Sequence, residues 1–259
     1  MIKVLRHVLI AIGRLFYGLY AWTAFLLVIL LTILFATFLP GLDRRRRWLS
    51  RTARVFLRVV GIPPTVSGLE HLPDDHCIVV VNHSSHVDGI VLQASLPPRF
   101  SFVIKGEVQK VPILHFVLRR VGAKFVERFI AAGSSRDARK LVKAAAEGES
   151  MVIFPEGTFL EEAGLGRFRP GAFAAAIKGE LPIVPVAIRG SRKILRARNF
   201  WPRHGTLHVD VLQPIETSGS AFASSAELAN LARSRMLEVL DEPDLLLSDS
   251  VPTVQNPEQ

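Results

Sequence analysis

The chain has 259 residues, 49% of them apolar, and a formal net charge of +9. This length allows one sizeable α/β domain with an appendage and is too short for two full enzymes. Cys77 is the single cysteine, so the composition excludes an internal disulfide and a cysteine-based zinc cluster. Much of the basic surplus lies beside an apolar N-terminal stretch, which favours anionic lipid over nucleic acid as the partner.

The first forty residues predict a membrane helix. No charged residue lies between Arg14 and Asp43, and residues 17–39 are interrupted only by small or weakly polar side chains. As a helix, this segment is long enough to cross a hydrocarbon layer of about 30 Å, and Pro40 and Gly41 end it. The alternative is a helical membrane anchor, a single helix or a helical pair that lies in one leaflet.

Arginines follow the apolar segment at once. Residues 44–47 are all arginine, and residues 51–60 place arginines on one helical face and apolar side chains on the other. The other flank is less basic, so the positive-inside rule places the main domain on the cytoplasmic side of the membrane. We therefore expect a membrane segment and basic amphipathic helix over residues 1–60, a globular domain over 61–240 and a disordered tail over 241–259.

Short apolar runs alternate with helical patterns in the globular domain. Strands are predicted at residues 77–81, 102–104, 151–154, 183–188 and 207–212. Helices are predicted at residues 88–95, 111–120, 134–147, 171–178 and 224–240. This alternation indicates an α/β fold, with a mixed central sheet covered by helices.

The most informative polar residues follow the strand predicted at 77–81. His83 and Asp88 are five residues apart, so on one continuous helix they would point about 140° apart. They can meet if His83 lies in the loop and Asp88 in the first helical turn. Asp88 then accepts the Nδ1 proton and leaves Nε2 as a base, a task that suits histidine because its ordinary pKa of about 6.5 lies near working pH. On these two residues alone, a structural histidine and a capping aspartate are the alternative interpretation.

Three further motifs carry residues suited to ligand binding. Residues 154–158, Phe-Pro-Glu-Gly-Thr, predict a tight turn at a strand end, where α/β proteins place ligands. Residues 122–128 predict a strand that ends in Arg128, whose guanidinium can bind a phosphate. Residues 183–187 form an apolar strand with an internal proline, which indicates an edge strand or a bulge. Each motif alone is equally consistent with an ordinary turn, a surface arginine or a plain strand.

In this order and at these spacings, the motifs resemble those of the 1-acylglycerol-3-phosphate acyltransferase family, within the glycerolipid acyltransferase superfamily. Residues 82–88 are similar to its His-x-x-x-x-Asp block and residues 122–128 to its Gly-x-x-Phe-(Ile/Val)-x-Arg block. Residues 154–158 are similar to its Phe-Pro-Glu-Gly-Thr block and residues 183–187 to its proline-containing block. The similarity runs from about residue 62 to residue 215.

The resemblance implies transfer of a fatty acyl group from acyl-CoA or acyl carrier protein to the free hydroxyl of a lysophospholipid. The acceptor it implies first is 1-acyl-glycerol-3-phosphate, which gives phosphatidate in phospholipid biosynthesis. It implies His83 as general base and Asp88 as its orienting residue, with no metal, no cofactor beyond the acyl donor and no acyl-enzyme. The acceptor-binding residues that it implies are Lys105, Arg128, Glu156, Gly157 and Thr158. The lipid bilayer is the other expected partner, and no nucleic acid is expected.

Three positions depart from the family's pattern. Ser84 stands where the family usually has glutamine, His115 where glycine is common, and Phe159 where an arginine binds the acceptor phosphate. Arg167 and Arg169 are the candidates to replace that arginine, because they follow a glycine-containing stretch that can fold them back. Arg167 is the more telling of the two, because the family often has a basic residue where Arg169 stands. The acceptor headgroup therefore stays open: another lysolipid or a lyso-aminolipid is the alternative acceptor. A non-catalytic, membrane-tethered lipid-binding protein is the alternative from a different class.

Overall fold

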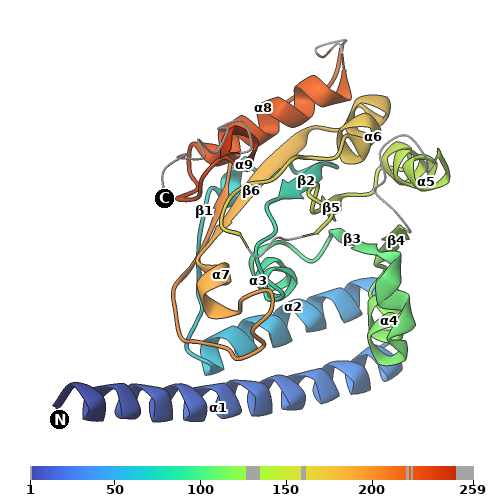
Figure 1. Ribbon diagram of the computed structural model, residues 1–259. Helices are drawn as coiled ribbons and strands as arrows, with labels where there is room; N and C mark the ends of the chain where they lie inside the picture. Colours follow the sequence, from blue (N-terminus) through green and yellow to red (C-terminus); the bar gives the residue numbers. More distant parts are fainter. Residues whose placement is uncertain (1, 127–134, 159–161, 220–221, 223, 249–259) are drawn as a thin grey trace, which may run out of the picture.

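The structure, a computed structural model, describes residues 2–126, 135–158, 162–219, 222 and 224–248. Within these residues the chain forms a seven-stranded sheet with the strand order β1-β7-β6-β2-β5-β3-β4 (Figure 1). The strands are β1 (Pro64–Ser67), β2 (Ile78–Val81), β3 (Ser101–Lys105), β4 (Lys124–Val126), β5 (Met151–Ile153), β6 (Ile183–Arg189) and β7 (Leu207–Val211). β6 and β7 are antiparallel and the other neighbours are parallel, so the expected mixed α/β sheet is confirmed.

The helices of the described residues cover this sheet. They are α1 (Ile2–Phe38), α2 (Leu42–Val59), α3 (Asp88–Ser95), α4 (Pro112–Arg120), α5 (Ser135–Ala146), α6 (Gly171–Gly179), α7 (Ser191–Ile194), α8 (Ser225–Leu237) and α9 (Leu245–Ser248), with short 3₁₀ helices at Leu69–His71 and Gly106–Lys110. The strands and helices predicted in the globular domain are all found, and the helix predicted at 224–240 ends at Leu237. The amphipathic helix predicted over 51–60 is longer, because α2 begins at Leu42. β1 has no counterpart among the predicted strands, because it is only four residues long, begins with a proline and alternates half-buried with exposed side chains.

The two faces of the sheet pack against different helices. α2 and α3 cover one face with α1 outside them, and α5, α6 and α8 cover the other (Figure 1). β2 is buried from both sides: Val79 and Val81 belong to the first core, Ile78 and Val80 to the second. A parallel strand enclosed in this way is an unbroken apolar run, and its rigid surroundings fix the start of the loop that follows it.

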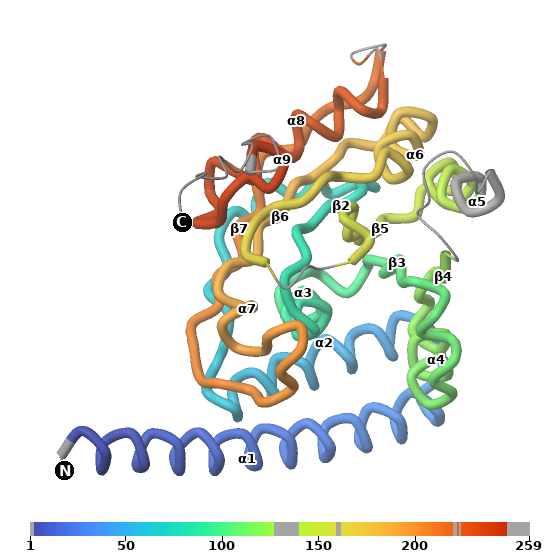
Figure 2. The backbone as a smooth tube through the Cα atoms, in the orientation of Figure 1, coloured from blue at the N-terminus to red at the C-terminus, as the bar shows by residue number. Residues whose placement is uncertain are grey.

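α1 runs lengthwise beside α2, and its N-terminal part extends beyond the domain (Figure 2). It is long and apolar enough to cross a membrane, judged by length and composition. Two tyrosines attach it to the end of α2: Tyr17 Oη donates to the carbonyl of Val60 at 3.0 Å, and Tyr20 Oη donates to that of Val59 at 2.8 Å. The N-terminal element is therefore a helical pair that packs along the domain.

Two of the four arginines that follow α1 hold the helices together. Arg45 Nη1 donates to the carbonyl of Arg120 at 3.0 Å, and Arg46 Nε donates to the carbonyl of Val121 at 3.0 Å. Arg120 Nε donates in turn to the carbonyl of Ala36 in α1 at 2.8 Å. These bonds join α1, α2 and the end of α4. Arg45 and Arg46 therefore have a structural role in addition to any effect of their charge on membrane orientation.

The C-terminal segment differs from the expected disordered tail. Residues 241–248 pack on the domain: Asp244 pairs with Arg233 of α8, and Leu245 is buried at 7% exposure. The acidic, proline-containing composition suggested a solvated tail, but an arginine of the preceding helix pairs with one of its acidic side chains. Residues 249–259 lie outside the described residues.

Candidate active site

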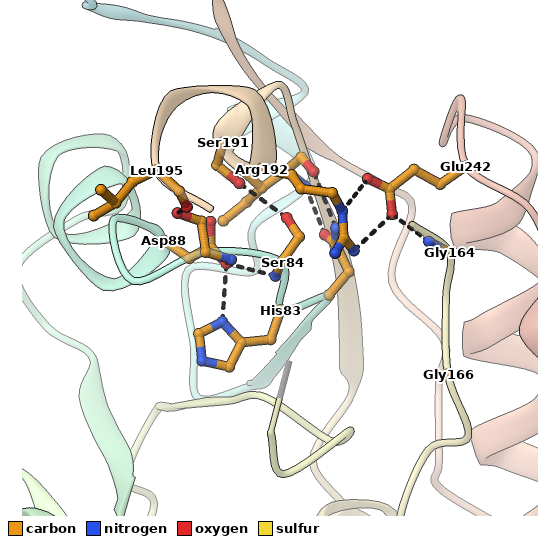
Figure 3. A network of polar contacts seen from close by, with 12 residues as sticks. His83, Ser84, Asp88, Gly164, Gly166, Ser191, Arg192, Leu195 and Glu242 are labelled. Carbon is orange, nitrogen blue, oxygen red and sulfur yellow. Dashed lines mark hydrogen bonds and ion pairs between the residues drawn. The ribbon is translucent and has the colours of Figure 1, made fainter. Parts of the chain in front are cut away.

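Three motif loops meet at one edge of the sheet. β2 pairs in parallel with both β5 and β6, so the carboxyl ends of these three strands lie side by side, where open α/β sheets bind ligands. His83 follows β2, Glu156 follows β5 and Ser191 follows β6. The fold thus brings together side chains that are as much as 107 residues apart in the sequence (Figure 3).

The histidine and aspartate of the first motif are in contact. Oδ2 of Asp88 lies 2.9 Å from Nδ1 of His83 and also accepts the backbone N–H groups of Ser84 and Ser85, each at 2.8 Å (Figure 3). Asp88 is the first residue of α3 and is fully buried. A loop histidine thus meets an aspartate in the first helical turn, the arrangement in which a spacing of five residues allows contact.

The imidazole of His83 is held on a second side by an aromatic ring. The His83 and Phe154 rings are stacked, with centroids 4.2 Å apart and planes inclined by 26°. The His83 side chain keeps 21% exposure, enough to meet a substrate at the surface of the domain. Nδ1 of the ring faces Asp88, and Nε2 is the nitrogen on the other side of the imidazole.

Glu156 connects the first and third motifs. Its Oε1 accepts the backbone N–H of His83 at 2.7 Å, and its Oε2 accepts the backbone N–H of Gly166 at 3.0 Å. Burial raises the pKa of this carboxyl, and the two N–H donors oppose that shift. The family resemblance implied acceptor binding by Glu156, but the contacts of this side chain are with backbone groups of the protein.

Arg169 is the arginine that reaches the third motif. Gly157 has a φ of +74°, and a Cβ atom there would lie 2.9 Å from Nε of Arg169. The backbone N–H of Arg169 donates to the carbonyl of Pro155 at 2.9 Å, which fixes the approach. The guanidinium therefore lies against the turn that precedes Phe159, where the family's missing arginine would begin. Arg167, by contrast, is exposed.

The other predicted acceptor residues are more scattered. Lys105 ends β3, is exposed, and its ammonium lies 3.0 Å from Glu107. Thr158 is exposed next to Gly157. Arg128 lies outside the described residues, so its predicted position remains a prediction. No cluster of histidine, cysteine and acidic side chains in the described part of the chain could hold a metal ion.

Sequence reasoning missed the residues that fix the loop after β2. Asn82 Nδ2 donates to the carbonyl of Ile188 at 3.0 Å, and its Oδ1 accepts the N–H of Ile188 at 2.7 Å. The buried hydroxyls of Ser84 and Ser191 lie 2.9 Å apart. These contacts attach the histidine loop to β6 and α7. The only sequence signal was the position of the asparagine, directly before the histidine.

An apolar cavity of about 350 Å³ lies beside this site. Residues of α1, α2, α3, β3 and α4 form its walls, among them Phe25, Phe56, Ile90, Phe102 and Leu118. His86 and Gly89, which lie three and six residues after His83, also line it. The cavity and the His83–Asp88 pair thus share one stretch of chain.

Comparison with known proteins identifies the class of this domain. The Acyltransferase family model matches residues 63–189, which contain the four motifs. This part of the chain is similar to the acyltransferase family. Curated relatives of the chain include 1-acyl-sn-glycerol-3-phosphate acyltransferases, which confirms the resemblance carried by the motifs.

Two plant relatives are chloroplastic 1-acyl-sn-glycerol-3-phosphate acyltransferases. The Arabidopsis thaliana protein is 30% identical over 179 residues, 68% of this chain and 49% of the relative, and the Brassica napus protein is 29% identical over 180 residues, 68% and 50%. This chain therefore spans about half the length of these two relatives. The Saccharomyces cerevisiae 1-acyl-sn-glycerol-3-phosphate acyltransferase is 27% identical over 245 residues, 92% of this chain and 77% of the relative.

A solved structure shares the fold. The 1-acyl-sn-glycerophosphate acyltransferase PlsC from Thermotoga maritima superposes with a TM-score of 0.74 over 88% of this chain and 95% of that one. Sequence identity between the two chains is 20%, so this likeness concerns the architecture alone.

Proposed function

We propose that this protein transfers a fatty acyl group from a thioester donor, acyl-CoA or acyl carrier protein, to the free hydroxyl of a lysophospholipid. The observation that carries the proposal is the His83–Asp88 pair at the sheet edge, next to an apolar cavity. The relatives' names give 1-acyl-sn-glycerol-3-phosphate as the acceptor of those proteins, and we propose it for this chain. The product is then phosphatidate, and the acyl donor is the only co-substrate.

The proposed reaction is a direct transfer. Nε2 of His83 takes the proton of the acceptor hydroxyl while that oxygen attacks the thioester carbonyl carbon. The C–S bond breaks as the tetrahedral intermediate collapses, and the imidazolium returns its proton to the leaving sulfur. Asp88 stabilises the imidazolium and keeps the ring oriented, the task of the aspartate in hydrolytic triads.

A cationic site for the acceptor phosphate is part of the proposal. The phosphate of lysophosphatidate carries close to two negative charges, and guanidinium groups bind such groups with strong, directional hydrogen bonds. The position of Arg169 against Gly157 supports it as the replacement for the arginine absent at Phe159. Arg128 and Lys105 keep their proposed roles by resemblance, and Arg167 is the weaker substitute because it is exposed.

The apolar cavity is the proposed site for the acyl chain. Its aromatic and aliphatic walls exclude water from a hydrocarbon, and burying each methylene is worth about 0.8 kcal/mol. Two of its walls come from α1 and α2, so the N-terminal helices would contribute directly to the donor or acceptor site.

The proposed membrane attachment follows from the outer face of α1. Leu27, Leu30 and Phe38 on α1 are 59%, 61% and 76% exposed, and Ile113 on the neighbouring α4 is 61% exposed. Because α1 is attached along the domain, it cannot span the bilayer perpendicular to the membrane plane without placing part of the domain inside the bilayer. The arrangement therefore favours a helical pair lying in one leaflet, with the catalytic domain on the cytoplasmic side as the positive-inside rule proposes.

Product analysis tests the proposed function. The detergent-purified protein would be given labelled acyl-CoA or acyl carrier protein together with lysolipids that carry or lack a terminal phosphate. We expect labelled phosphatidate, identified by mass, and none from the His83→Ala variant. Faster acylation of a phosphate-free lysolipid or lyso-aminolipid would support the alternative acceptor, in keeping with Phe159. Absence of product with every pair would support a non-catalytic lipid-binding protein.

A further inference from the structure

The C-terminal segment crosses the loop that follows the third motif. The N–H of Leu165 donates to the carbonyl of Pro243 at 2.9 Å, and Leu165 and Asp244 form an isolated parallel bridge. Gly164 has a φ of +145°, and a Cβ atom there would lie 2.5 Å from Leu245 Cγ, so glycine lets the two segments approach. We call residues 241–248 the strap.

A buried arginine fastens the strap to this loop from the helix side. Arg233 of α8 is 6% exposed, and its Nε donates to the carbonyl of Gly166 at 2.8 Å. Its Nη2 donates to the carbonyl of Leu165 at 2.7 Å, and its guanidinium forms a two-point ion pair with Asp244 of the strap. One side chain thus satisfies two backbone carbonyls of the loop and one carboxylate of the strap.

A second ion pair attaches the strap to α7, the short helix that follows β6. Arg192 binds Glu242 through Nε at 3.0 Å and through Nη2 at 3.1 Å, and Glu242 also accepts the N–H of Gly164 at 2.9 Å (Figure 3). Charge-assisted, two-point contacts of this kind fix geometry as well as add stability. The loop is therefore fixed by Arg233 on one side and by Glu242 on the other.

The loop that contains Leu165 and Gly166 is connected to the His83–Asp88 pair through the carboxylate of Glu156. Gly166, whose carbonyl binds Arg233, donates its N–H to Glu156, and Glu156 accepts the N–H of His83. The same loop leads into Arg169, which lies against Gly157. A shift of Leu165 and Gly166 would thus reach both the histidine loop and the arginine proposed for the acceptor phosphate.

We propose that Arg233 is a positioning residue and that the strap, through Asp244 and Glu242, sets the position of Glu156 and Arg169 for acceptor binding. The expected effect on acceptor KM rests on the proposed acyl transfer. The expected effect on the positions of Glu156 and Arg169 is independent of it. None of the three side chains touches a reacting atom in this scheme. Their effect passes through Gly166 and Glu156.

The kinetic test separates positioning from general stability. Asp244→Asn and Glu242→Gln each remove one charge and keep the shape of the side chain. Arg233→Lys keeps the charge but loses the two-point contact with Asp244. The matched control is Glu149→Gln, which breaks the Lys124–Glu149 ion pair of 2.8 Å at the other side of the sheet. We expect the strap variants to raise the acceptor KM at least about fivefold with the donor KM unchanged. Lower kcat with both KM values unchanged, as in partly unfolded enzyme, would overturn the proposal.

Amide hydrogen exchange tests the structural part without activity. We expect Asp244→Asn to speed exchange in peptides covering residues 162–169 and also residues 79–87, which contain the His83 amide bound by Glu156. The Glu149→Gln control should leave both peptides unchanged. Faster exchange in 162–169 alone would show that the strap does not reach the histidine loop. If no acyl transfer is found for the wild type, this measurement still decides the positioning part.

Discussion

The backbone N–H of His83 lies 2.7 Å from Oε1 of Glu156, although 73 residues separate them in the sequence. The other oxygen of Glu156 accepts Gly166 N–H at 3.0 Å. The Glu156 carboxylate therefore binds the loop of the first motif and the loop at Gly166 at the same time. These two contacts need its two acceptor oxygens.

Glu156→Gln should impair the site while the fold survives. The glutamine amide has one acceptor oxygen, so one of the two N–H groups, of His83 or of Gly166, would face an NH₂ donor. Leaving a buried donor unsatisfied costs about 1–3 kcal/mol. We expect kcat/KM for the acceptor to fall about tenfold or more, measured beside the thermal midpoint. Unchanged kinetics would show that the two hydrogen bonds of Glu156 are not needed for acceptor use.

The proposed general base predicts graded losses in the first motif. His83→Ala should reduce turnover by about 10²- to 10⁴-fold, the usual contribution of a positioned base. Asp88→Asn keeps an oxygen for the N–H groups of Ser84 and Ser85 but removes the charge that stabilises the imidazolium, so a residual rate should remain. Circular dichroism would confirm folding. A His83→Ala enzyme with more than about a tenth of wild-type turnover would contradict the assignment.

Arg169 and Arg167 form a matched pair for testing the acceptor phosphate. Arg169→Ala removes the guanidinium beside Gly157, whereas Arg167→Ala removes an exposed one two residues away. A hydrogen bond to a charged group is worth about 1.5–3 kcal/mol, so we expect Arg169→Ala to raise the acceptor KM about tenfold or more. Arg167→Ala should change it less than about twofold. The phosphate role fails if the two variants behave alike, or if acceptors without phosphate are equally affected.

The N-terminal helices should both attach and stabilise the protein. The full chain should stay with vesicles after a high-salt wash, because the exposed face of α1 is apolar and salt weakens only electrostatic attraction. A chain that begins at residue 61 loses Ala53, Phe56 and Leu57, which are core residues of α2. We therefore expect it to unfold or aggregate. Release of the full chain by salt alone would contradict the attachment.

Cys77 should be inert in the folded protein. The side chain is fully buried, and burial raises the pKa of its thiol to about 11, so the reactive thiolate is scarce at neutral pH. We expect maleimide labelling at pH 7 to be slow in buffer and fast in denaturant, followed by mass spectrometry. Rapid labelling of the native protein would mean that the start of β2 opens readily.

The sequence by itself determined most of the strands and helices after residue 61, though not β1, and it allowed a contact between His83 and Asp88. Both follow from local periodicity and from a spacing of five residues across a loop and a first helical turn. It could not determine that α1 lies along the domain, since an apolar helix has the same composition whether it packs lengthwise or crosses a bilayer.

Only the tertiary structure decided which distant groups share the site. Glu156 is a conspicuous carboxylate in the sequence, but its partners are backbone N–H groups of two other loops, and backbone donors leave no sequence signal. Arg169 lies against Gly157 because the turn brings its side chain there, whereas Arg167 is exposed. The strap was predicted to be a disordered tail, because a sequence shows its charges but not where their partners lie. Its partner Arg233 is on α8, and the position of α8 depends on packing against the sheet.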